Sequence, residues 1–302
     1  MAILNFMRRP DADPRIALPG EASIEVIPRT AAKIADFTAL LPAGTRVYVA
    51  HIDGTPIDDM IATARRLRDE GFEPMPHIPA RMIRDRCELD TWLSRYSAEA
   101  GATQALVLAG GVARPRGEFE NSMQLLETGL FDSHGFRRLH AAGHPEGNAA
   151  IDADNSAQLL DEALRWKAAF AARTDARMAL VTQFVFEAEP VLTWARRLAA
   201  EGVDLPIHVG VAGPARLQTL IRFALACGVG PSLKVLERRA KDLTNLVRPF
   251  EPTRILSDLS AAHASGRAGN IEAIHVFPLG GIAETADYLD RLTVRATDRL
   301  SS

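Results

Sequence analysis

The chain has 302 residues, of which 47% are hydrophobic, and its formal net charge is −3. This length allows one large domain or two ordinary ones, and the weak, interspersed charge excludes a strongly basic nucleic-acid or membrane-surface binder. The two cysteines, Cys87 and Cys227, form no CxxC or Cys/His motif, so neither a zinc site nor a disulfide framework is expected. Because no run resembles a signal peptide or reaches the length of a membrane span, we expect a cytoplasmic protein.

Residues 1–20 are polar and proline-rich, which predicts an N-terminal arm before one domain over 21–302. From there, apolar segments of strand character alternate with segments of helical spacing. The expected strands are Ala22–Ile27, Arg46–His51, Glu73–Ile78, Gln104–Ala109, Arg137–Ala142, Ala179–Glu187, Pro206–Val211 and Ile271–Phe277. The expected helices are Pro28–Leu41, Pro56–Glu70, Arg84–Ala100, Asn121–Leu130, Ser156–Ala172, Pro190–Glu201, Ala215–Cys227, Pro231–Val247 and Ile282–Leu292. The polar stretch Glu251–Asn270 is expected to be a long connection.

Eight strands, nearly all followed by a helix, predict a parallel sheet closed as a (β/α)₈ TIM barrel, in a single domain with extra helices. A doubly wound open sheet is the alternative architecture. It is disfavoured because no G-x-G-x-x-G follows the first strand and no Walker A sequence occurs.

In such a barrel the active site forms at the carboxyl ends of the strands. Polar residues expected there include Glu25, His51, Asp53, His77, His144, Glu146, Asn148 and Gln183. Glu25 is unusual because it lies inside an apolar strand, and burial is expected to raise its pKa, as suits a general acid. His208 and His275 lie within strands and are expected to be core histidines, and converging histidines are only a weak indication of a metal site.

Gln183 lies near the end of the sixth expected strand, where a buried amide needs hydrogen-bond partners. It is either paired inside the protein or aimed at a ligand. Two interpretations are also possible for the glycine-containing turns at Gly110-Gly111, Gly210–Pro214 and Gly280-Gly281. They allow close approach of a ligand or a phosphate, or they serve tight turns between strands and helices.

Taken together, these motifs resemble the methylenetetrahydrofolate reductase family over most of the chain from Ala22 to Leu292. The strongest is T-Q-F-V-F-E at Thr182–Glu187, similar to the family's T-Q-F-F-F-D. S-I-E-V-I-P-R at Ser23–Arg29 resembles F-E-F-F-P-P, and P-H-I-P-A-R at Pro76–Arg81 resembles H-L-T-C. A-G-H-P-E-G-N at Ala142–Asn148 resembles A-Y-P-E-x-H, and the helix carrying Lys167 resembles the one that carries the family's flavin-contacting lysine.

The resemblance implies a flavin-bearing barrel that uses FAD and NAD(P)H to interconvert 5,10-methylenetetrahydrofolate and 5-methyltetrahydrofolate. Glu25 would be the general acid at the folate and Gln183 would hydrogen-bond the pterin. The flavin would lie among Ala50, His51, Asp53, His77, Ala109, Gly110, Gly111, His144, Asn148 and Lys167. The tetrahydrofolate derivative would also meet Leu217 and Gly281, and neither a metal nor a nucleic acid is implied.

Four positions depart from the family pattern. Gly111 replaces an aspartate near the flavin, Gly281 replaces a folate-contacting arginine, Leu217 replaces a stacking aromatic and His144 replaces a flavin-contacting tyrosine. Without the negative charge at Gly111 the flavin potential is expected to rise, because a nearby charge disfavours the anionic reduced flavin. This favours the oxidative direction, as methyl-group catabolism needs.

Three other functions stay open at this stage. One is a flavin-independent relative that moves hydride directly between nicotinamide and folate. The second is a phosphate-binding TIM-barrel lyase, although no lysine ends a strand as a Schiff-base nucleophile. The third is a non-catalytic folate or flavin carrier. The choice between NADH and NADPH, the direction of flux and homo-oligomer formation are not fixed by the sequence.

Overall fold

The computed structural model describes residues 16, 20–148, 150–152, 154, 156–227, 236 and 249–297. Eight parallel strands close in sequence order, from β1 to β8 and back to β1. This confirms the (β/α)₈ TIM barrel, and the open doubly wound sheet is wrong. The expected arm over 1–20 and the expected helix Pro231–Val247 lie outside the described residues, apart from residues 16, 20 and 236.

The strands lie where the sequence pattern predicts them, within a few residues at most ends. They are β1 Ser23–Val26, β2 Arg46–Val49, β3 Glu73–Pro79, β4 Gln104–Leu108, β5 Arg138–Gly143, β6 Arg177–Thr182, β7 Ile207–Ala212 and β8 Ile271–Phe277. The helices are α1 Pro28–Ala31, α2 Ile57–Asp69, η1 Ala80–Met82, α3 Arg86–Ala100, α4 Ser122–Glu127, α5 Leu130–Ser133, α6 Gln158–Ala171, α7 Ala188–Ala200, α8 Leu217–Ala226, α11 Thr253–Ala264 and α12 Ile282–Thr297.

The expected helix Pro28–Leu41 is wrong beyond its first turn, because α1 ends at Ala31. The Asp36 carboxylate accepts hydrogen bonds from both the backbone N–H and the hydroxyl of Thr38, and this local bonding competes with a helix. Arg66 of α2 donates to the carbonyls of Ala31 and Ile34, which a continuing helix would have used.

The polar connection expected over Glu251–Asn270 is also wrong, because α11 occupies most of it. Its apolar residues recur with helical spacing and are buried, among them Ile255, Leu256 and Leu259. The expected helix Asn121–Leu130 is divided into α4 and α5 at Gly129, whose φ of 69° is left-handed.

Alternating strand residues face two different environments, as the two-residue period of a strand requires. Side chains such as Ile24, Val47 and Val209 face the helices and join the main apolar core. The opposite face points into the barrel, where Tyr48, Met75, Leu106 and Val181 form a small cluster of their own.

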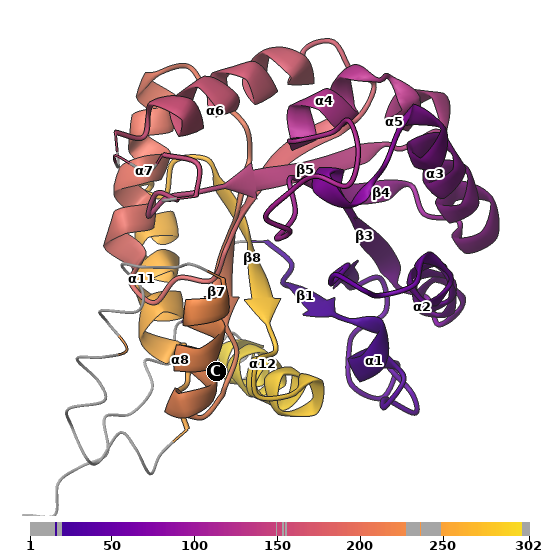
Figure 1. Cartoon of the computed structure of the whole chain (residues 1–302). Helices are drawn as coiled ribbons and strands as arrows, with labels where there is room; N and C mark the ends of the chain where they lie inside the picture. Colours follow the sequence, from indigo (N-terminus) through magenta and orange to yellow (C-terminus); the bar gives the residue numbers. More distant parts are fainter. Residues whose placement is uncertain are drawn as a thin grey trace, which may run out of the picture.

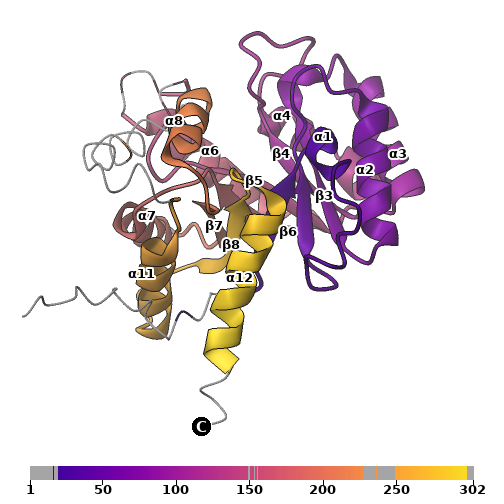
Figure 2. The ribbon, with the colours of Figure 1, turned by 90° about the horizontal axis from the view of Figure 1, so that it is seen from below.

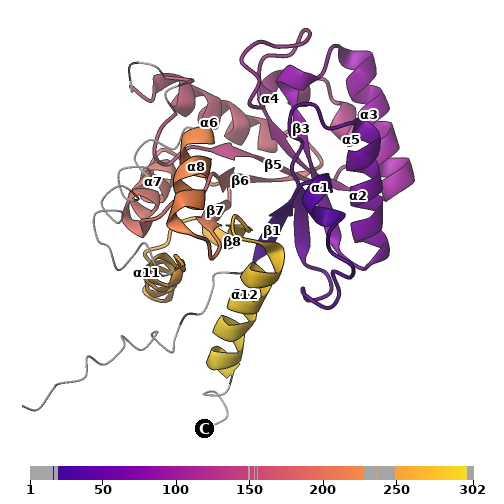
Figure 3. The same cartoon turned by 60° about the horizontal axis from the view of Figure 1, so that its bottom comes forward.

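The helices pack around the barrel in two groups. Helices α2 to α5 cover one side, and α6, α7, α8 and α11 cover the other, as the three views agree (Figures 1, 2 and 3). The barrel closes where β8 pairs with β1, through Ser23 with His275 and Ile24 with Val276. In the part of the chain described, no helix is long and apolar enough to cross a membrane.

Candidate functional site

Glu25 of β1 is the carboxylate around which polar side chains gather inside the barrel. His77 of β3 brings its Nε2 to 3.3 Å from Glu25 Oε2, and His275 of β8 brings its Nε2 to 3.8 Å from the same oxygen. The Glu25 side chain keeps 19% of its exposure, whereas both histidines are buried. The barrel therefore holds a carboxylate between two imidazoles with one edge open to solvent.

The expected rise in the pKa of Glu25 is wrong. Burial alone would raise this pKa, but the interactions with His275 and His77 outweigh burial and lower the pKa to about 2. Burial lowers the pKa of His275 even though Glu25 favours its charged form. Glu25 is therefore ionised at neutral pH and acts as an acceptor of protons or hydrogen bonds.

His51 follows β2 at the barrel mouth, beside Ala50. Its Nε2 lies 3.0 Å from the carbonyl oxygen of Thr55, its ring contacts Trp92, and its buried Nδ1 has no hydrogen-bond partner among the described residues. Burial lowers the pKa of His51, so its ring is neutral at pH 7, and its Nδ1 is left as an acceptor without a partner among the described residues.

Asp53 lies in the same loop but is exposed and forms an ion pair with Arg116, which belongs to the loop after β4. This pair ties the loops after β2 and β4 together. The predicted flavin contact of Asp53 would therefore compete with an existing partner.

The consecutive glycines after β4 differ in what requires them. Gly110 has a φ of 92°, and a Cβ there would lie 2.9 Å from Pro79 Cβ, so the backbone requires glycine. A Cβ at exposed Gly111 would meet nothing within 4 Å. Ala109 precedes them and accepts a hydrogen bond from the Arg81 N–H, which fixes the start of the loop.

Lys167 of α6 is a second buried ionisable group on the other side of the mouth. Its Nζ donates to the carbonyl of Ala142 at 2.9 Å, and burial lowers its pKa to about 8. Burial lowers the pKa of His144 to about 4, with a further contribution from the charge of Lys167. The amine and the imidazole predicted at the flavin are thus neighbours.

Asn148 lies in the loop between β5 and α6, where its side-chain oxygen accepts from the N–H of Ala150. Buried Asp152 anchors the end of this loop by accepting hydrogen bonds from the N–H groups of Leu159 and Leu160 at the start of α6. Asn148 is therefore used by its own loop, and its predicted flavin contact stays untested.

Gln183 follows the end of β6, because the expected strand Ala179–Glu187 stops at Thr182. The Gln183 side-chain oxygen accepts from the Phe184 N–H at 3.0 Å, and the Thr182 hydroxyl accepts from the Gly210 N–H. These bonds replace the strand ladder, which resumes only as a bridge between Val185 and Val211. The Gln183 amide nitrogen has no hydrogen-bond partner among the described residues.

The apolar residues after Gln183 form an aromatic cluster rather than more strand. Phe184 packs edge-on against Phe186 and Phe277, and Phe186 packs against Phe250. Leu217, predicted to touch the folate, is the first residue of α8 and is buried in this cluster. Its contact with a ligand remains a prediction.

The glycines after β7 and β8 have packing reasons. A Cβ on Gly210 would lie 2.4 Å from the Thr182 carbonyl oxygen, and one on Gly280 would lie 2.1 Å from that of Pro214. Gly281 has a φ of 141°, and its Cβ would lie 2.0 Å from Glu284 Oε2. The tight-turn interpretation accounts for these positions without a phosphate.

The sequence pattern did not single out Ser23, Tyr48 or His140. The expectation that His208 and His275 are core histidines is confirmed, since each is 1% exposed. Ser23 Oγ lies 3.0 Å from His275 Nδ1, and the hydroxyl of Tyr48 lies 2.5 Å from His140 Nδ1. A signal was present, since Ser23 and Glu25, and likewise Arg46 and Tyr48, are polar residues two apart in a strand and share one face.

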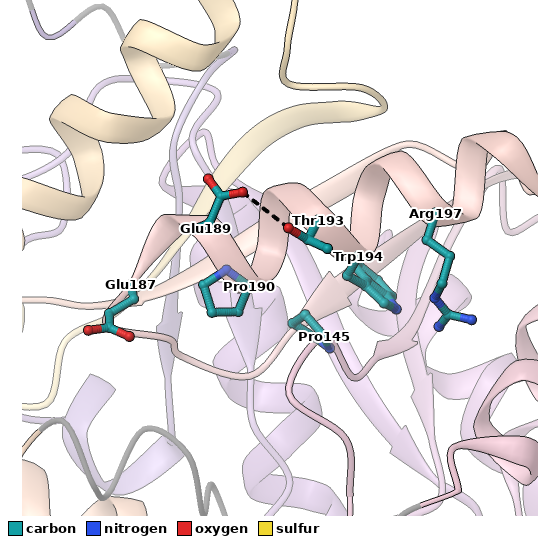
Figure 4. Close-up of a pocket in the computed structure, with 7 residues that line it drawn as sticks. All are labelled: Pro145, Glu187, Glu189, Pro190, Thr193, Trp194 and Arg197. Atoms are coloured by element: carbon teal, nitrogen blue, oxygen red, sulfur yellow. Dashed lines mark hydrogen bonds between the residues drawn. The ribbon is translucent and has the colours of Figure 1, made fainter.

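A shallow groove lies outside this cluster, between the loop after β5 and the start of α7 (Figure 4). It is lined by Pro145, Glu187, Glu189, Pro190, Thr193, Trp194 and Arg197. Trp194 packs against Gly143, where a Cβ would lie 2.8 Å from its ring. None of the residues predicted to bind cofactor or substrate lines this groove.

Among the described residues, no group of three or more His, Cys, Asp or Glu side chains has the arrangement of a metal site. The mouth presents the carboxylate of Glu25, the imidazoles of His51 and His77, and the buried amine of Lys167. No protein-family model matches the sequence.

Proposed function

We propose that this chain is a folate-linked flavin oxidoreductase that interconverts 5,10-methylenetetrahydrofolate and 5-methyltetrahydrofolate, with NAD(P)H as co-substrate, and that it serves the oxidative direction. The observation that carries the proposal is the position of the Glu25 carboxylate at the barrel mouth, with its Oε2 3.3 Å from His77 Nε2 and 3.8 Å from His275 Nε2. The family resemblance supplies the substrate class.

The charge state of Glu25 favours oxidation of the methyl group over its formation. Opening the folate imidazolidine ring requires a proton donor, whereas closing it requires a base. As N10 attacks the iminium carbon, it loses a proton, and an ionised carboxylate can accept that proton. Because the pKa of Glu25 is lowered to about 2, the base form is the resident form.

Several mouth residues fit a flavin. His51 has a buried Nδ1 with no partner among the described residues, and Lys167 uses one of its three N–H groups on the Ala142 carbonyl. Lys167 can donate to ring or phosphate oxygens, whereas the His51 Nδ1 can accept a hydrogen bond from a ring N–H or a hydroxyl, because its Nε2–H faces the Thr55 carbonyl. Gly110 and Gly111 leave the start of the loop after β4 without side chains. Bound FAD would supply the hydride acceptor for the methyl group and pass the hydride to NAD(P)⁺.

The glycine at position 111 also favours the oxidative direction of the reaction. A carboxylate here would disfavour reduced anionic flavin, because two like charges close together repel. Its absence raises the flavin potential, so the flavin accepts hydride more readily and donates it less readily. The overall equilibrium of the reaction is unchanged, since only the half-reactions shift.

Gln183 is the candidate for orienting the pterin. Its oxygen is used by the Phe184 N–H, which leaves its amide nitrogen to donate to a ligand. Gly281 brings no side chain to the folate, so this chain would hold the substrate without the arginine of the family pattern.

The test begins with the visible spectrum of the purified protein and chromatography of any released cofactor. We expect flavin absorbance, FAD in the released fraction, and bleaching when 5-methyltetrahydrofolate is added without oxygen. A colourless protein that FAD cannot reconstitute would contradict the proposal. Direct transfer of hydride between nicotinamide and 5-methyltetrahydrofolate by that colourless protein would identify the flavin-independent alternative.

A further inference from the structure

The end of the barrel opposite the mouth carries three arginines on the inward face of its strands. They are Arg46 at the start of β2, Arg138 at the start of β5 and Arg177 at the start of β6. The residue that follows each of them in its strand is buried in the outer apolar core. The two-residue period of a strand therefore turns the three arginines inward, so positive charge gathers where the strands begin.

Arg138 and Arg177 are direct neighbours, because β5 and β6 pair in parallel with these two residues in register. Like charges opposite each other on adjacent strands repel. Among the described residues, neither side chain has a hydrogen-bond or ion-pair partner, and Arg177 is exposed while Arg138 is half-buried. Each guanidinium has five N–H groups, so this pair offers many donors and no acceptor.

Arg46 adds a third guanidinium at the same end of the barrel. Its Nε donates to Gln104 Oε1 at 2.7 Å, and Gln104 is the register neighbour of Arg138 on β4. Burial lowers the pKa of Arg46, and the charge of Arg138 lowers it further. The two guanidinium groups therefore lie within electrostatic reach of each other.

Two buried histidines lie further inside, with ring nitrogens that have no partner. His140 follows Arg138 by two residues on the same face of β5, and its ring lies 4.5 Å from that of His208 on β7. His140 Nε2 and both nitrogens of His208 have no hydrogen-bond partner among the described residues, although the two side chains are 0% and 1% exposed. Buried polar atoms are nearly always hydrogen-bonded, so these nitrogens point to a ligand.

The unpartnered nitrogen of His140 is a donor. The hydroxyl of Tyr48 lies 2.5 Å from His140 Nδ1, and burial raises the pKa of Tyr48, so the phenol keeps its proton and donates it to Nδ1. Burial lowers the pKa of His140 well below its usual value, so the ring is neutral and its one proton is on Nε2. This end of the barrel therefore has more donors than acceptors.

Two carboxylates face the same end but do not neutralise it. Glu73 accepts a hydrogen bond from Gln104 and lies 3.9 Å from Arg68. The Oε1 of half-exposed Glu272, beside the register shift between β7 and β8, lies 3.7 Å from His208 Nε2. A cation here would be repelled by the three arginines, whereas an anion would meet their N–H groups.

We propose that the end of the barrel opposite the mouth is a second binding site, which holds a small oxyanion of the sulfate or phosphate type between Arg138 and Arg177. Guanidinium groups match the oxygens of such an ion with paired N–H donors. Arg46 adds positive charge, and the rings of His140 and His208 form the inner wall. The site is independent of the proposed function, since none of these residues lies at the mouth.

Calorimetric titration of the full chain with inorganic sulfate tests the site, in chloride buffer of constant ionic strength so that screening stays equal. We expect saturable binding by the wild type. Affinity should fall about tenfold or more in Arg138→Gln and in Arg177→Gln, because each loses charge-assisted hydrogen bonds. Arg177 is exposed at the barrel end, so its variant is expected to fold.

Arg137→Gln is the matched control for the loss of one positive charge. Arg137 is exposed one position before Arg138 and continues the backbone ladder of β5, so the strand period turns its side chain away from the barrel interior. Its variant should keep the wild-type affinity. An equal loss in Arg137→Gln, equal affinity in the wild type and Arg177→Gln, or no saturable binding by the wild type would overturn the site.

Nitrogen-15 NMR of histidine-labelled protein tests the location of the bound ion. We expect sulfate to shift the ring signals of His140 and His208 along the same curve as the calorimetry, and to leave His134, which pairs with Asp90 on the outer surface, unchanged. Glu272→Gln should tighten binding up to about fivefold, because it removes an opposing surface charge. Binding that leaves both inner rings unshifted, or weaker binding in Glu272→Gln, would overturn the site.

Discussion

Glu25, which is partly exposed, and Lys167, which is buried, both lie at the barrel mouth, and both have a lowered pKa for opposite reasons. Two histidines near Glu25 stabilise its charged form enough to overcome burial. Lys167 has one backbone carbonyl and no acidic side-chain partner among the described residues, so burial acts against its charge. A lowered pKa therefore means that the charged form is stabilised at Glu25 and destabilised at Lys167.

This difference shows which strands can supply partners. The side chains of β1, β3 and β8 face one another inside the barrel, so Glu25 meets residues distant in sequence. Lys167 reaches the mouth from an outer helix and meets the backbone at Ala142. A ligand with an anionic group would be the missing partner of Lys167, whereas Glu25 already has its partners.

Removing the Glu25 carboxylate should have the largest effect. Glu25→Gln keeps the shape but cannot accept a proton, and we expect a loss of about 10²–10⁴-fold in turnover of 5-methyltetrahydrofolate. Steady-state kinetics would measure it, with Glu21→Gln, exposed just before the same strand, as the control. Full turnover in Glu25→Gln would remove this residue from the chemistry.

Lys167→Met should show how much burying the charged amine lowers the free energy of unfolding. The folded pKa of about 8 lies below the usual 10.5, so the unfolded chain binds more protons between these values. Wild-type stability should therefore rise from pH 8 to 10.5, by about 3 kcal/mol in total. Denaturant unfolding should show this slope in the wild type and in Lys33→Met but not in Lys167→Met. An equal slope in all three would contradict the comparison.

His77→Gln should weaken the interactions that stabilise the charged form of Glu25. The lowered pKa of Glu25 contributes stability that is fully present above pH 4.5 and is lost as the pH falls toward 2. Without His77, we expect the pKa of Glu25 to rise by about 1 unit and the stability at neutral pH to fall by about 1–2 kcal/mol. Acid titration of the folded protein followed by carboxyl-carbon NMR would measure the pKa, and an unchanged value would leave His275 as the main partner.

Gly111→Asp should change stability least, because it adds a charge at an exposed position with open space. We expect less than about 0.5 kcal/mol in unfolding free energy. If FAD binds as proposed, its reduction potential should fall, which spectroelectrochemistry would measure. The neighbouring Gly110→Asp is the contrast, since the φ of 92° and Pro79 oppose any side chain there. An unchanged flavin potential in Gly111→Asp would separate Gly111 from the cofactor.

The sequence by itself determined the order of strands and helices and the set of polar residues at the strand ends. Alternating apolar segments predicted the barrel, because each pattern reflects one local period and one buried face. Local pattern also marked Glu25 as an unusual carboxylate. It failed at α1, α11 and the end of β6, where side chains such as Asp36 and Gln183 compete with the backbone ladder or where polar residues cover a helix.

Only the tertiary structure decided the charge state of Glu25 and the polar interior beneath it. The pKa depends on distances to His77 and His275, which lie 52 and 250 positions away in the chain and become neighbours when β8 closes on β1. Closure likewise placed His208 beside Glu272 through a bulge that no local pattern indicates. Electrostatic interactions fall with distance and depend on burial, and neither quantity exists until the strands are paired.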